Sequence, residues 1–183
     1  KFAFVSLLIS LLYLGTSTIH KFNSARVFKQ NLKEKNITVT DFTSTPTMFT
    51  SWLWNMIAYN DSTMYLAEYS VFQKSKKIEI VSIPRNLQSL NTIKNSYAVQ
   101  TAIWFSEGKY FTVPVSNDTT AFFITKWGRG DFSQTDPFKM MPFYSKLYKD
   151  KNGKVSFQQV EPDFTNDDFK NYFSMLKKRI FEY

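Results

Sequence analysis

The chain has 183 residues, no cysteine, a single histidine and a formal net charge of +8, and aromatic residues make up 18% of it. This length allows one folded domain of about 150 residues, and so many aromatic side chains argue against a disordered chain. The absence of cysteine excludes disulfides and cysteine-ligated metal sites. The positive charge is spread along the chain among apolar periodic segments, which argues against nucleic acid as a partner.

The chain begins with an apolar run, residues 2–19, in which no side chain is charged. As a helix, its 18 residues would extend about 27 Å, close to the hydrocarbon thickness of a bilayer. We therefore predict a transmembrane helix over residues 1–19. Because the chain begins at Lys1 rather than at a methionine, we expect it to be the last such helix of a longer protein. Two alternatives stay open: a signal peptide, for which Gly15-Thr16-Ser17 is a weak cleavage site, and a buried core helix.

Residues 20–36 are predicted to continue this helix as a basic segment next to the membrane. From His20 to Lys35 there are five basic side chains and one acidic side chain, Glu34. Positive charge beside an apolar span favours the cytoplasmic side and attracts anionic lipid headgroups. The expected membrane contacts are Lys21, Arg26, Lys29 and Lys33. The expected apolar face of the same segment consists of Phe22, Ala25, Phe28 and Leu32.

Residues 37–183 are predicted to form one soluble α+β domain, which begins with a polar break at residues 43–46. Hydrophobic patterns and turn residues predict seven strands, and the first is apolar on both faces, which indicates a central strand. The predicted strands are 51–59, 64–72, 77–83, 110–115, 119–127, 142–148 and 154–160. The predicted helices are 87–103 and a C-terminal helix that is capped by Thr165. The apolar stripe of this second helix consists of Phe169, Tyr172, Phe173, Leu176 and Ile180. The expected fold is a mainly antiparallel sheet of about six to seven strands with flanking helices.

The segment from Lys126 to Asp131 is the densest polar and aromatic cluster of the sequence, and it follows an apolar strand. Binding loops often stand at strand ends, and the two glycines of this segment allow unusual backbone angles. The planar guanidinium of Arg129 suits phosphate or carboxylate, and Trp127 would cover an apolar part of the same ligand. We therefore predict a ligand site at Lys126, Trp127, Arg129 and Asp131. The alternative is a tight turn with a solvated arginine.

Residue types that carry catalysis are sparse in this sequence. His20 is at the expected membrane boundary, so neither a Ser-His-Asp arrangement nor a transition-metal site has its usual complement of ligands. The acidic side chains in the folded part are scattered, without a spacing that joins two of them. We expect the chain to hold no metal or cofactor by itself and to be catalytically silent with divalent metals.

Several short motifs occur in an order that resembles one known family. They are KFNSARVFKQNLKEKNI after the apolar run, STPTMFTSWLWNMIAY, the strand around Tyr69-Ser70, IPRN, AIWFSEGKY and KWGRGDF. Together they resemble the C-terminal part of the bacterial membrane-bound metal-dependent hydrolases, the YdjM-like family. The resemblance implies an inner-membrane protein whose metal ligands lie in an upstream, histidine-containing membrane region, so that a divalent metal belongs to the longer protein. It adds Arg85 and Trp104 to the candidate ligand-binding residues.

Three functions remain as hypotheses. The first is an accessory, non-catalytic domain of a membrane hydrolase, on the cytoplasmic face of the bacterial inner membrane, in contact with lipids and with an upstream multi-helix domain. The second is a membrane-tethered module that binds an anionic headgroup or a partner protein. The third is a secreted domain whose apolar run is a signal peptide.

Overall fold

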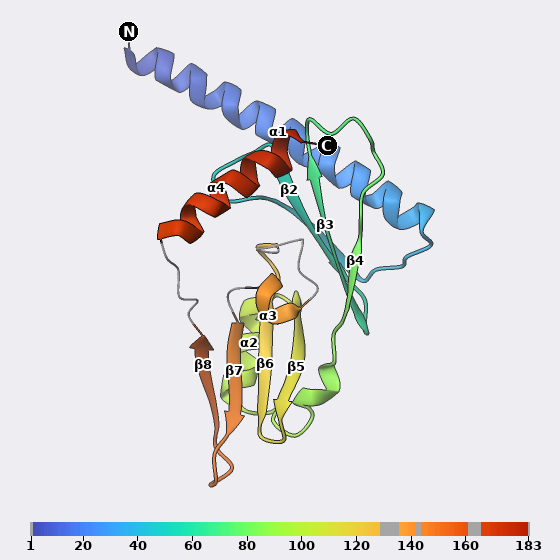
Figure 1. Ribbon diagram of the computed structural model, residues 1–183, viewed down its shortest axis with the longest axis vertical. Helices are drawn as coiled ribbons and strands as arrows, with labels where there is room; N and C mark the ends of the chain where they lie inside the picture. Colours follow the sequence, from blue (N-terminus) through green and yellow to red (C-terminus); the bar gives the residue numbers. More distant parts are fainter. Residues whose placement is uncertain (1, 129–135, 142–143, 161–165, 183) are drawn as a thin grey trace.

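The structure, a computed structural model, describes residues 2–128, 136–141, 144–160 and 166–182 (Figure 1). It begins with helix α1 (Phe2–Glu34) and strands β1 (Asp41–Pro46), β2 (Leu53–Tyr59), β3 (Thr63–Ser70) and β4 (Val81–Pro84). A 3₁₀ turn, η1 (Leu87–Leu90), and helix α2 (Tyr97–Ser106) lead to β5 (Tyr110–Ser116) and β6 (Thr119–Ile124). The last elements are α3 (Pro137–Met140), β7 (Tyr144–Lys149), β8 (Val155–Val160) and α4 (Asn166–Phe181).

The strands of the described residues form two antiparallel sheets of four strands each. Sheet A has the order β1-β2-β3-β4 and sheet B the order β5-β6-β7-β8. The expected α+β class is confirmed, but the expected single sheet of six to seven strands is wrong. The two sheets separate after β4, because Pro84 ends that strand and the chain then leaves for η1 and α2 before it returns as β5.

Strand β1 occupies residues that the sequence predicts as a polar break. It lies at the edge of sheet A and pairs with β2 from Asp41 opposite Tyr59 to Pro46 opposite Trp54. An edge position tolerates polar side chains and a terminal proline, because one side of the strand needs no ladder partner. Because this strand is polar, its sequence lacks the hydrophobic pattern from which a strand is predicted.

Two further boundaries differ from the prediction. Of residues 77–83, the part that pairs as a strand begins at Val81. The residues before it run beside α1, where Asn31 donates to the Lys76 carbonyl and accepts from the backbone N–H of Ile78. The predicted helix 87–103 is divided into η1 and α2, because the Ser96 side chain accepts from the backbone N–H of Val99 and starts a new helix there.

Helix α1 is continuous over 33 residues, as predicted for the apolar run and the basic segment together. Every residue from Phe2 to Thr16 is exposed, and this half projects beyond the rest of the chain (Figure 1). It is the one helix of the described residues that is long and apolar enough to cross a membrane. The second half packs on sheet A through its buried residues Ser24, Val27, Phe28, Asn31 and Leu32.

The expected apolar face of that second half is therefore partly wrong. Phe28 and Leu32 are buried as predicted, whereas Phe22 is 67% exposed. Two polar side chains complete the packed face instead. Ser24 Oγ lies 3.0 Å from Ser44 Oγ of β1, and Asn31 is bonded to the segment before β4. These pairings satisfy polar groups that a purely apolar pattern would have excluded from the face.

The core consists of layers, each built from one face of a sheet. Between the sheets, Ile57, Met64 and Leu66 of sheet A cluster with Phe111 and Phe123 of sheet B. The other face of sheet A packs on α1, and the other face of sheet B packs on η1 and α2. The order is therefore helix, sheet, sheet, helix, with α4 against Leu53 at one end of β2.

Strand β2 is the central strand that the sequence predicts, with six of its seven residues buried. Trp54 is 2% exposed, and its indole N–H donates to the Ser51 carbonyl at 2.9 Å. The C-terminal helix is also present, and Leu176 and Ile180 of its predicted stripe are buried. Phe173 of the same stripe is 51% exposed, and the predicted cap, Thr165, lies outside the described residues.

Candidate functional site

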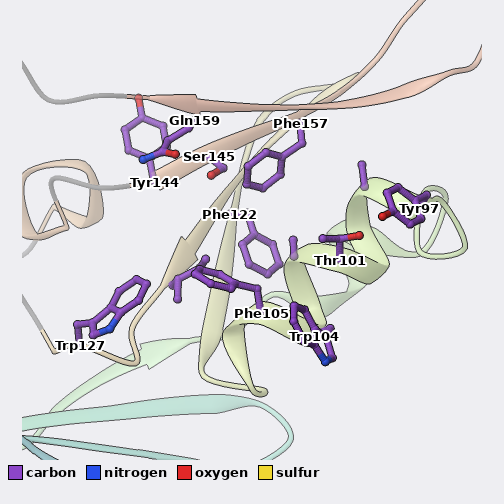
Figure 2. Close-up of a pocket in the computed structure, with 13 residues that line it drawn as sticks. Tyr97, Thr101, Trp104, Phe105, Phe122, Trp127, Tyr144, Ser145, Phe157 and Gln159 are labelled. Atoms are coloured by element: carbon purple, nitrogen blue, oxygen red, sulfur yellow. The ribbon is translucent and has the colours of Figure 1, made fainter.

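A groove with a volume of about 650 Å³ lies between α2 and sheet B. Figure 2 shows Phe105, Phe122 and Phe157 turned into the space between the helix and the strands, with Tyr97 at one end and Trp127 at the other. The lining is mostly apolar, and its polar groups include Thr101, Ser145 and Gln159. A concave, aromatic surface with few polar groups is typical of small-molecule and peptide sites.

The sequence of α2 explains why this helix leaves a groove. Its buried residues are the small or medium-sized Val99, Ala102 and Ser106, which face the core under η1 and β5. Its large side chains point elsewhere, since Tyr97 is 87% and Trp104 78% exposed. The helix is thus attached by small residues, and its aromatic residues remain beside the sheet rather than beneath the helix.

The end of α2 is fixed by two residues in the left-handed region. Glu107 has a φ of 53° and Gly108 a φ of 78°, which is a common way to end a helix. A Cβ at Gly108 would lie 2.6 Å from the hydroxyl of Tyr59, so glycine is required here for space as well as for conformation. The turn brings Lys109 to a position 3.3 Å from Asp41 of sheet A.

Lys126 and Trp127, two of the predicted ligand-binding residues, follow β6 at one end of the groove. The Lys126 ammonium lies 4.2 Å from the centre of the Phe105 ring and 5.0 Å from that of Trp127. It also donates to the Phe105 carbonyl at 2.9 Å and lies 3.4 Å from a carboxylate oxygen of Glu107. Lys126 therefore holds α2 against the end of β6, beside the groove-lining residues Phe105 and Trp127.

Trp104 lines the same groove as Trp127, so the structure brings together two residues from distant predicted motifs. Arg129 and Asp131, predicted for the same site, lie outside the described residues. Gly128, just before them, has a φ of 91°, and a Cβ there would lie 2.3 Å from the side-chain carbon Cγ of Asn55. The start of this loop thus lies directly against β2 and requires glycine.

Arg85 is placed away from the groove, at the junction of the two sheets. It is 5% exposed and donates from three nitrogen atoms to the carbonyls of Asn60, Gly108 and Tyr110, at 3.0, 2.8 and 3.2 Å. Its guanidinium lies 4.6 Å from the centre of the Tyr59 ring and 5.0 Å from that of Tyr110. Because Asn60 belongs to sheet A and the other two carbonyls to the start of sheet B, Arg85 joins the sheets.

Burial governs the ionisation of this junction. It lowers the pKa of Arg85 from its ordinary value, while the rings of Tyr110 and Tyr59 and the carboxylate of Asp61 act in the opposite direction. Burial likewise raises the pKa of Tyr110, and the neighbouring Arg85 opposes that rise. The arginine thus keeps its charge through carbonyls and aromatic rings rather than through a carboxylate in contact.

The predicted membrane contacts lie on the exposed side of α1. Arg26, Lys29 and Lys33 share a shallow hollow with Phe22, Ala25 and Gln30. The Lys29 ammonium lies 5.3 Å from the centre of the Phe42 ring, and Lys21 is exposed one residue after His20. These cations follow the apolar half of the helix. Arg26, Lys29 and Lys33 form one basic strip, whereas Lys21, five residues before Arg26, faces a different direction around the helix.

Sequence reasoning missed a polar cluster on the inner face of sheet A. Asn55 faces Thr45 of β1 and Glu68 of β3, and Glu68 pairs with Arg179 of α4. The side-chain oxygens of Asn55 (Oδ1) and Thr45 (Oγ1) are buried and have no hydrogen-bond partner among the residues that the structure describes. An asparagine that interrupts the apolar run of β2 was the available signal. Within the described residues, no three His, Asp or Glu side chains gather as a metal site would require.

Comparisons with protein families, with curated proteins and with solved structures find no match for this chain.

Proposed function

We propose that the chain is a membrane-anchored, non-catalytic accessory domain of a bacterial membrane-bound hydrolase. The observation that carries this proposal is the division of α1 into an exposed apolar half and a half that packs on sheet A. Exposing so many contiguous apolar side chains to water is unfavourable, whereas a bilayer would cover them. The basic strip follows immediately, as expected at the cytoplasmic surface of an inner membrane.

The remaining parts of the proposal come from the sequence motifs and residue types. The order of the motifs resembles the C-terminal part of the metal-dependent membrane hydrolases, which suggests an upstream membrane region that binds the divalent metal. One histidine and no cysteine in the whole chain favour an accessory role for this part. The domain would then hold or orient a substrate or partner beside the catalytic region.

Expression of the chain in bacteria, with an added initiator methionine, tests the anchor. Its intact mass should retain residues 1–19, and the protein should stay with the membrane after extraction at alkaline pH. Removal of the apolar run would show a signal peptide instead. A reporter fused after Tyr183 should be active on the cytoplasmic side. No turnover of ester, phosphoester or peptide substrates is expected with zinc, manganese or magnesium.

A second function, ligand binding in the α2 groove, is favoured by its aromatic lining. We propose an apolar or aromatic ligand, because aromatic rings dominate the walls of the groove. The probe is the anionic dye anilinonaphthalene sulfonate, added to the full chain in detergent-free nanodiscs. Thr101→Phe should fill the groove and weaken binding of the dye, whereas Gln100→Phe, exposed on the same helix but outside the lining, should not.

A further inference from the structure

A group of large apolar side chains is exposed at the end of the domain from which the free half of α1 emerges. Met48 and Phe49 are 63% and 76% exposed, and Trp52, Phe72, Phe173 and Phe181 are each about half exposed. We call these six residues the aromatic edge. They come from the β1–β2 connection, from the residue pair after β3, and from α4.

The residues of the aromatic edge contact one another. The Phe72 and Phe181 rings stack with their centres 5.2 Å apart, and Trp52 lies within 5.7 and 6.1 Å of the two. The Phe49 and Phe173 centres are 6.0 Å apart. The rings therefore form two groups, Trp52 with Phe72 and Phe181, and Phe49 with Phe173. Helix α4 carries one ring of each group, eight residues or about 12 Å apart, so both groups belong to the same end of the domain.

A hydrogen bond fixes this surface to the membrane end of α1. His20 is the first residue after the apolar run, and its Nδ1 lies 3.1 Å from the carbonyl oxygen of Ser51. Ser51 directly precedes Trp52, and its carbonyl also accepts from the indole of Trp54. The aromatic edge thus lies at the level of the helix where the apolar half ends, next to where a bilayer surface would be.

The backbone at Phe49 is strained in order to expose this ring. Phe49 has a φ of 68°, in the left-handed region that a bulky aromatic residue rarely adopts. The conformation closes the turn in which the Thr50 N–H donates to the Thr47 carbonyl at 3.2 Å. The turn accounts for the backbone angle, and the same angle holds the Phe49 ring at the surface, where an apolar partner would cover it.

The chemistry of the surface identifies that contact. Tryptophan and phenylalanine beside lysine are typical of segments that lie in the interface of a bilayer. On α4, Phe173, Lys177 and Phe181 are spaced four residues apart, so they share one flank of the helix, and Lys177 is exposed between the two rings. Lys74 and Lys77 follow Phe72 in the segment that then reaches Asn31 of α1, farther from the apolar half.

We propose that the aromatic edge inserts into the interface of the same bilayer that α1 spans, so that the domain docks flat on the membrane instead of standing away from it. This inference rests on the proposed membrane anchor. It adds a second lipid contact, formed by the folded domain, and it fixes the orientation of the α2 groove relative to the membrane surface.

Because the chain has no cysteine, single introduced cysteines carry a spin label at one position each. The full chain is reconstituted in vesicles of phosphatidylethanolamine and phosphatidylglycerol, and the collision rate of each label with oxygen is compared with that of a water-soluble nickel complex. Leu8→Cys reports on the apolar half of α1, and Met48→Cys reports on the aromatic edge without removing a ring. Trp104→Cys is the matched control, since it is an exposed residue of α2.

The ratio of oxygen to nickel collisions should be highest at Leu8 and lowest at the control, Trp104. At Met48 the ratio should be severalfold higher than at Trp104. In a Phe49→Ser/Phe181→Ser double variant, the ratio at Met48 should fall towards that of Trp104 while the ratio at Leu8 stays unchanged. A high ratio at Leu8 with equal ratios at Met48 and Trp104 overturns the docking and leaves the anchor intact. A ratio at Leu8 as low as that of the control overturns both proposals.

Discussion

Sheet A and sheet B have the same topology, a four-stranded antiparallel meander with a helix on its outer face, yet the two helices are held differently. Helix α1 is fixed to sheet A by polar pairs at three levels, through His20, Ser24 and Asn31. Helix α2 rests on sheet B through small residues, with a polar contact from Lys126 only at its C-terminal end, and it leaves its aromatic rings around a groove. Directional hydrogen bonds fix the rotation and height of a helix, whereas small apolar contacts only keep it near the sheet.

The difference separates two tasks within one fold. Helix α1 is fixed in one orientation relative to sheet A, whereas helix α2 leaves part of the surface of sheet B open. The predictions below test this division, first on the side of sheet A, then at the junction of the sheets, and last on α2.

The largest effect is expected in the middle of sheet A. Trp54→Ala should lower the free energy of unfolding by about 3–5 kcal/mol, because it leaves a cavity between β2 and α1. The measurement is urea unfolding of the full chain in detergent, followed by circular dichroism. An unchanged midpoint would show that α1 does not depend on this contact.

At the junction, Arg85→Met should cost about 3 kcal/mol. Three hydrogen bonds from a charged donor are lost, each worth about 1.5–3 kcal/mol, but removing a buried charge also removes its desolvation cost, which offsets part of the loss. Hydrogen exchange should then speed up at both the β2–β3 turn and the start of β5. Arg85→Lys is the control, since it keeps the charge and part of the bonding. Faster exchange confined to one sheet would contradict the role of Arg85 as a joint.

Asn31→Ala should cost about 1–3 kcal/mol, because it takes the side-chain partner from the buried Ile78 N–H and from the half-buried Lys76 carbonyl. The effect should be local, so that hydrogen exchange rises in residues 76–80 more than in sheet B. Gln30→Ala, on the exposed side of α1, is the matched control. Equal destabilisation by the two substitutions would mean that α1 is held by apolar packing alone.

The smallest effect on stability is expected on α2. Trp104→Ala should change the free energy of unfolding by less than about 0.5 kcal/mol, since the side chain is mostly in water. The same substitution should weaken dye binding in the groove. A large loss of stability would show that Trp104 supports the fold, and the proposed division between the two sheets would then be wrong.

The sequence predicts individual elements where local pattern decides them. The uncharged run before a basic segment predicts α1, and the apolar stretch around Trp54 predicts the central strand. The turns at Asn60 and Asn152 predict the hairpins, since asparagine and glycine favour their backbone angles. These features depend on residues that are close in the sequence, so they can be predicted without knowledge of the fold.

The division into two sheets depends on contacts that no local pattern records. Every strand in the core has an apolar face, so the pattern does not say whether that face meets a helix or another sheet. From the sequence, Arg85 is a candidate ligand-binding residue through the family resemblance alone. Its structural role is visible only when Asn60 and Gly108 are brought together. Strand β1 was missed because its partner in the packing, Ser24, is itself polar.

The candidate site was predicted in part for the same reason. The aromatic residues at Trp104 and Trp127 stand out locally, and the structure places both on one groove. The opposite wall, with Phe157 and Gln159, comes from the far end of sheet B, and nothing in its sequence distinguishes it from an ordinary edge strand. A groove forms between two elements, so the residues of its second wall cannot be predicted until the relative placement of the two elements is known.

The unbroken course of α1 has a mechanical consequence. A rigid helix of 33 residues, about 50 Å long, transmits rotation about its own axis from one end to the other. The number of residues between the spanning half and Ser24 therefore sets the direction of the α2 groove within the membrane plane. One residue inserted there would turn the domain by about 100°, and seven would return it to nearly the starting direction. The number of residues in this part of the helix therefore determines which neighbour of the spanning segment the groove faces.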